Sequence, residues 1–114
     1  MALTISIKHV PNYTRGGVGR TRFNDDISAW QVQHVKSTAE MFYNAWVFDV
    51  DLALWAVSEV TNMASMFFNA AAFSADISSW DVGKVTSMRT IFQGASRLLV
   101  SEPSLLSWNV SRVK

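Results

Sequence analysis

The apolar residues of this chain recur with a period of about 25 residues. Tryptophan marks each copy, at Trp30, Trp55, Trp80 and Trp108, with intervals of 25, 25 and 28 residues. Each tryptophan has an isoleucine or leucine three residues before it and valines two and five residues after it. Periods of about 20 to 50 residues are typical of proteins that stack similar coils, because one copy cannot bury its apolar face alone.

The aligned copies share further apolar columns, which we expect to form one continuous core together with the four tryptophans. Side chains that stack on their own equivalents pack as stripes, so a uniform column predicts burial. These columns are Phe23, Phe48 and Phe73; Ile27, Leu52, Ile77 and Leu105; Val32, Val57, Val82 and Val110; Val35, Val60, Val85 and Val113; Thr38, Met63 and Met88; Met41, Met66 and Ile91; Phe42, Phe67 and Phe92; and Ala45, Ala70 and Ala95.

Within a copy, the sequence predicts two short extended pieces and one helical turn. Residues 76–82 are rich in β-forming residues with partial alternation, and residues 85–88 offer a second extended piece. Residues 66–70 have the character of a helical turn. The expected fold is therefore an α+β repeat, a right-handed leucine-rich-repeat-like β-solenoid of about four 25-residue coils with short parallel strands.

One column of turn-forming residues predicts where each helical turn ends. Asparagine and glycine accept a left-handed backbone, which is common just after the last residue of a helix. The column consists of Asn44, Asn69 and Gly94.

The repeat also divides the chain. Residues 1–22 are expected to form a degenerate N-terminal coil or cap, and residues 23–114 the solenoid. The last copy stops in mid-coil, after the valine that precedes a new methionine–phenylalanine turn, so we expect a fragment of a longer array. The predicted coils are 23–47, 48–72, 73–97 and a partial coil 98–114.

Composition fits a packed domain without obvious chemistry. The 114 residues are 49% hydrophobic and 17% charged, and the net charge of +1 predicts no nucleic-acid partner. There is no cysteine, no signal-peptide pattern and no apolar run long enough to span a membrane. His9 and His34 stand at non-equivalent positions without a repeated serine or aspartate, so no catalytic residue and no cofactor are expected.

Two charged columns have predictable partners. Asp26, Asp51 and Asp76 would repel one another when stacked, and backbone N–H groups of the following turn are the expected compensation. Calcium is the alternative, but the neighbouring columns do not repeat a full oxygen set, so no metal site is predicted. Glu59 lies between His34 and Lys84 in another column, where opposite charges would pair weakly.

The third copy resembles a known repeat. Residues 73–95, FSADISSWDVGKVTSMRTIFQGA, are similar to the repeat of BspA-like leucine-rich-repeat surface proteins, which mycoplasma surface lipoproteins also carry. The resemblance covers residues 23–113. It implies a cell-surface or secreted protein that contacts host proteins, other cells or matrix through the face of its solenoid. The chain itself carries neither the export signal nor the lipid-anchor cysteine of such lipoproteins.

Large apolar residues outside the core columns are the candidate partner contacts. They are natural interface anchors, or they pack against a flanking domain or coil. With the resemblance, they lead us to expect a non-enzymatic binding or adhesion module for a protein or glycan partner. An intracellular structural or scaffolding repeat protein is the alternative. The candidate contacts are Tyr43, Trp46, Leu54 and Phe68.

Overall fold

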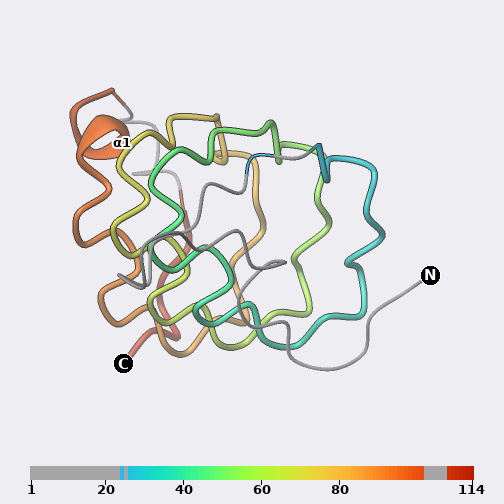
Figure 1. Cartoon of the computed structure of the whole chain (residues 1–114). Helices are drawn as coiled ribbons and strands as arrows, with labels where there is room; N and C mark the ends of the chain where they lie inside the picture. Colours follow the sequence, from blue (N-terminus) through green and yellow to red (C-terminus); the bar gives the residue numbers. More distant parts are fainter. Residues whose placement is uncertain (1–23, 25, 102–107) are drawn as a thin grey trace.

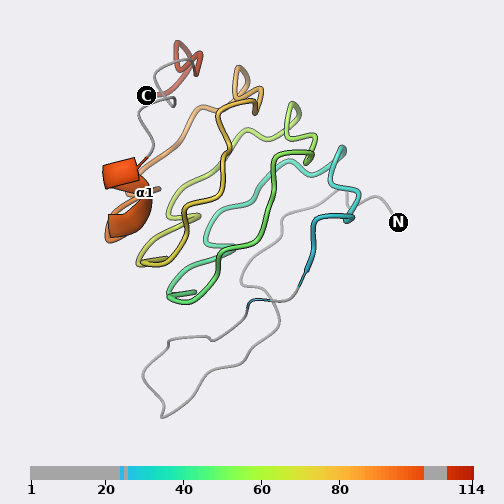
Figure 2. The ribbon, with the colours of Figure 1, turned by 90° about the horizontal axis from the view of Figure 1, so that it is seen from above.

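The chain winds into successive coils that lie side by side. The computed structural model describes residues 24, 26–101 and 108–114. Figures 1 and 2 show the coils following one another from the cyan to the orange part of the chain. Phe23, Leu105 and the predicted N-terminal coil at residues 1–22 lie outside the described residues.

The predicted β-solenoid is wrong, because the described residues form no β-strand. Parallel pairing is limited to isolated bridges that join Asn62 to Ser37 and to Ser87. The expected strand at residues 76–82 instead contains a turn, in which the Trp80 N–H donates to the Ile77 carbonyl at 3.1 Å. The backbone turns every few residues, so no stretch stays extended long enough to build a sheet.

The predicted helical turn at residues 66–70 is also absent, and the hydrogen bonds explain why. In the equivalent segment of the preceding coil, the Met41 N–H bonds within the coil to the Thr38 carbonyl (3.0 Å). The next amide, that of Phe42, donates to the Met66 carbonyl of the following coil (2.9 Å). Successive N–H groups thus alternate between the two coils, whereas an α-helix would keep all of them in one segment.

The left-handed turns were predicted in part. The Asn44, Asn69 and Gly94 column has positive φ angles of 60°, 58° and 78°, which confirms its left-handed backbone. A second left-handed column was missed, because its residue types do not usually mark such a conformation. That column consists of Glu40, Ser65 and Thr90.

The only helix in the described residues is α1, Ser96–Ser101. It follows the left-handed Gly94 and places Leu98 in the core, with Ser96 and Arg97 at the surface. It lies where the spacing between tryptophans grows to 28 residues, so the extra residues coincide with a change in the path of the coil.

The core follows the predicted columns in the middle of the stack. Trp55 and Trp80 are 3% and 4% exposed, and the valine, methionine, phenylalanine and alanine columns around them are buried. The prediction is wrong at the two ends, because Trp30 is 39% and Val110 49% exposed. Met88, Phe92 and Val113 are only partly buried against the core.

Candidate binding surface

The tryptophan row holds the coils together from inside. Adjacent indoles stack with ring centroids 6.3–6.5 Å apart and planes within 9° of parallel. The indole N–H groups of Trp55, Trp80 and Trp108 donate to carbonyls of the preceding coil at 3.1, 2.9 and 3.1 Å. A buried indole needs such a partner, so this row is structural and unavailable to a ligand.

Tyr43 and Phe68, two of the four predicted contacts, form one aromatic pair. Their rings stack at 4.7 Å with planes 5° apart, and both side chains are half-buried. Each residue precedes a left-handed asparagine, and the Asn69 amide donates to the Asn44 side-chain oxygen at 3.1 Å. The pair therefore sits on two turns that are already locked to each other.

The other two predicted contacts lie elsewhere on their coil. Leu54 is 91% exposed at the tip of the turn closed by the Trp55 N–H and the Leu52 carbonyl (3.0 Å). Trp46 is half-buried, and its carbonyl accepts the Ala72 N–H at 3.2 Å. The ring contact joins Tyr43 to Phe68, whereas Leu54 and Trp46 belong to other turns.

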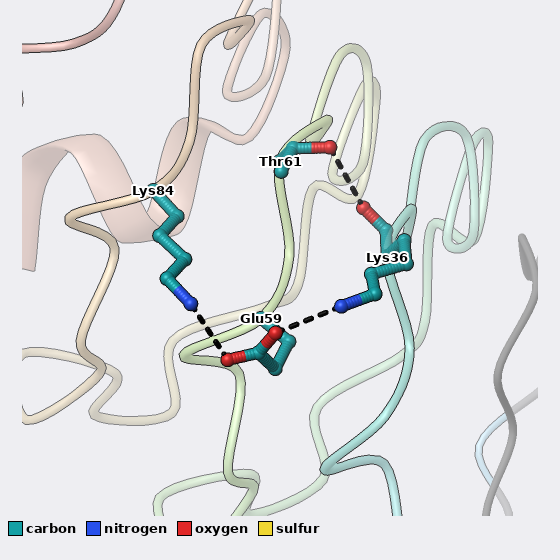
Figure 3. A network of polar contacts seen from close by, with 4 residues as sticks. All are labelled: Lys36, Glu59, Thr61 and Lys84. Carbon is teal, nitrogen blue, oxygen red and sulfur yellow. Dashed lines mark hydrogen bonds and ion pairs between the residues drawn. The ribbon is translucent and has the colours of Figure 1, made fainter.

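Glu59 is the centre of an ion-pair network (Figure 3). One carboxylate oxygen lies 2.8 Å from the Lys36 Nζ and the other 2.8 Å from the Lys84 Nζ. The Lys36 and Lys84 ammonium groups lower the pKa of Glu59 to about 2. The predicted Lys84 partner is confirmed, but the second partner is Lys36 and not His34. A lysine side chain is long enough to reach diagonally across coils, which alignment by columns does not reveal.

The aspartate column closes turns as predicted. The Asp26, Asp51 and Asp76 carboxylates accept the backbone N–H two residues later at 2.9–3.0 Å. Hydrogen bonds from the Ser28 and Ser78 side chains and N–H groups lower the pKa of Asp26 and Asp76. Among the described residues, no cluster of histidines, cysteines and carboxylates could hold a metal ion.

A second side-chain row, missed from the sequence, links the coils. The Asn24 side-chain oxygen accepts the Asp49 N–H at 2.8 Å, and the Asp49 carboxylate accepts the Ser74 N–H at 2.9 Å. All three are small residues with a side-chain oxygen at one column, which is a signal that the sequence did contain. The row stabilises the stack and has no exposed chemistry of its own.

Comparison with known proteins gives a single match. Residues 14–114 match a protein family described as "Mycoplasma protein of unknown function, DUF285". No curated protein and no solved structure matches the chain. Within the part of the chain that the structure describes, no helix is long and apolar enough to cross a membrane. The match supports the mycoplasma side of the resemblance, while the likeness to BspA-like proteins stays a prediction. Because the match covers most of the sequence, the chain belongs to the DUF285 family of mycoplasma proteins.

Proposed function

We propose that the chain is a non-enzymatic binding or adhesion module that presents a face of its coil stack to a protein or glycan partner. The contact residues are Tyr43, Trp46, Leu54 and Phe68. The BspA-like resemblance motivates the proposal, and the stacked Tyr43–Phe68 pair carries it, with its rings 4.7 Å apart. Aromatic side chains dominate the energetics of many interfaces, because they bury a large area at little conformational cost.

The stack keeps these side chains in fixed positions before a partner arrives. Backbone bonds from Asn44 to the Phe68 carbonyl (2.8 Å) and from Asn69 to the Gln93 carbonyl (2.7 Å) tie the aromatic turns to their neighbours. A partner therefore pays little for ordering them, which favours affinity. Leu54 adds an apolar tip in a column whose other described members, Ala29 and Ser79, are small.

The test is a binding screen with substituted chains. The unchanged chain is screened against immobilised matrix proteins, host-cell surfaces and glycans, and each hit is repeated with Tyr43→Ala/Phe68→Ala and with Leu54→Ala. We expect the double variant to weaken binding at least tenfold, because truncating hot-spot residues costs 2 kcal/mol or more, about tenfold per 1.4 kcal/mol. Gln33→Ala, at an exposed and variable position, is the matched control.

Two results would contradict the proposal. The contact assignment fails if every partner binds both variants as well as the unchanged chain. The adhesion function fails if cell fractionation finds the native protein confined to the cytosol, which would favour the structural or scaffolding alternative.

A further inference from the structure

One edge of the stack carries a row of aligned backbone positions with a lysine at each end. The Lys36 carbonyl accepts the Thr61 N–H (2.8 Å), and the Thr61 carbonyl accepts the Thr86 N–H (2.8 Å). The Thr86 carbonyl then accepts the Lys114 N–H (3.0 Å). The Thr61 and Thr86 hydroxyls donate to the same carbonyls at 3.2 and 3.3 Å, which fixes the row further.

A second row runs two residues earlier in each coil. Glu59, Lys84 and Arg112 occupy equivalent places, because each lies inside a turn between two valines that is closed by the same 3.0 Å hydrogen bond. Lys84 and Arg112 are exposed. Glu59 bonds to Lys36 in the first row and to Lys84 in its own row, so the two rows form one surface (Figure 3).

This surface is strongly cationic in a chain that is nearly neutral overall. Among the residues of the two rows from Lys36 to Lys114, Glu59 is the single carboxylate side chain against four cations. Exposed aspartates lie instead between six residues before and one residue after a tryptophan. We call the cationic surface the basic edge; its cations are Lys36, Lys84, Arg112 and Lys114. Such segregation creates a local positive potential despite a net charge of +1.

We propose that the basic edge binds a linear sulfated polysaccharide. Its cations are spread along the stack and not gathered around one point, so they match a polymer with repeated anionic groups better than a single anion. The described residues of the two rows include no aromatic side chain for stacking bases and no large apolar side chain for entering a membrane. The inference deepens and rests on the proposed binding function, but it uses other residues than the Tyr43–Phe68 pair.

Glu59 gives the proposal a directional test. Its carboxylate orients Lys36 and Lys84, and it competes with any anionic ligand for both ammonium groups. Removing its charge should therefore tighten binding of a polyanion. We expect Glu59→Gln to tighten binding about two- to fivefold and Lys84→Gln to weaken it by a similar factor, as for exposed ion pairs.

The matched control changes the net charge by the same amount elsewhere. Asp49→Asn adds one positive charge, as Glu59→Gln does, and two turns of the backbone separate Asp49 from Glu59. Asn24 occupies the equivalent position in the preceding coil and makes the same hydrogen bond, so the substitution preserves local structure. If binding is local to the basic edge, Asp49→Asn should bind as the unchanged chain does.

The experiment measures binding of the full chain to heparin by calorimetry at low and at physiological salt, with poly-uridylate RNA and polyglutamate as competing polyanions. The expected result is salt-sensitive heparin binding, tighter for Glu59→Gln, weaker for Lys84→Gln and unchanged for Asp49→Asn. Three outcomes overturn the proposal: no binding of heparin at low salt, equal tightening by Asp49→Asn and Glu59→Gln, or tighter binding of either competitor. Tyr43→Ala/Phe68→Ala should leave heparin binding unchanged, so failure of the aromatic contact site is measured separately.

Discussion

Trp30 and Trp55 occupy the same position of the repeat, yet they differ sharply in burial. The two indoles stack on each other at 6.5 Å, but Trp30 is 39% exposed and Trp55 only 3%. Trp55 has a second indole, that of Trp80, on its other side at the same distance. Burial in this fold is therefore set by neighbours on both sides of a coil, and the repeat motif alone does not determine it.

The largest effect that separates the two positions concerns stability. Trp55→Ala should cost about 3–5 kcal/mol of the free energy of unfolding, because the rings above and below hold the cavity open. Trp30→Ala should cost about 1–2 kcal/mol, since less area leaves water in the folded state. Urea unfolding of both variants measures the difference. Equal losses would show that the two tryptophans are buried alike.

Gly94 tests how closely the turns of adjacent coils approach. Its φ is +78°, and a Cβ added there would collide with the Asn69 side-chain oxygen. Gly94→Ala should therefore destabilise the chain by about 1–3 kcal/mol through backbone strain and displacement of Asn69. Gly83→Ala is the control in the same coil, because its added Cβ would approach the Asp81 carboxylate only to 3.2 Å. Similar unfolding midpoints for the two variants would contradict this packing.

A smaller contrast is expected in the valine column. Val57 is buried in the second coil, whereas Val110 in the last coil is 49% exposed. Val57→Ala should cost about 1–2 kcal/mol, and Val110→Ala less than about 0.5 kcal/mol. Thermal unfolding followed by calorimetry distinguishes them, and a larger loss for Val110→Ala would reverse the assignment of inner and end coils.

The smallest effect is the pH dependence of the Glu59 network. Its pKa falls from an ordinary 4.5 to about 2 in the folded chain, so the unfolded state binds the proton more readily. The stabilisation is complete above about pH 4.5 and disappears as the pH falls toward 2. Glu59→Gln should lack this part of the acid dependence. An unchanged stability difference between the variant and the parent chain from pH 6 to pH 2 would contradict the pairing.

The period of the sequence predicted which side chains form the core, but it did not predict the backbone path. Columns such as Val35, Val60 and Val85 are buried because identical residues at a fixed spacing meet in the stack. The expected strand at residues 76–82 failed, since the β-forming residues there close a turn from Ile77 to Trp80. Tertiary contacts between coils overrode the local preference, as is common for β propensity.

The candidate surface was predictable to a similar degree. The exposure of Leu54 and the pairing of Tyr43 with Phe68 follow from their columns, because the aromatic residues are 25 positions apart. The bond from Lys36 to Glu59 crosses from one column to another and depends on side-chain length, so alignment of the copies missed it.

The central claim is that the coils join through backbone hydrogen bonds in a 25-residue register without forming a sheet. Scalar couplings across hydrogen bonds, measured by nuclear magnetic resonance, test it most directly at two amides. The account predicts couplings from the Thr61 N–H to the Lys36 carbonyl and from the Thr86 N–H to the Thr61 carbonyl, with slow amide exchange at both. Fast exchange at these amides, or couplings to carbonyls four residues earlier in the same coil, would contradict it.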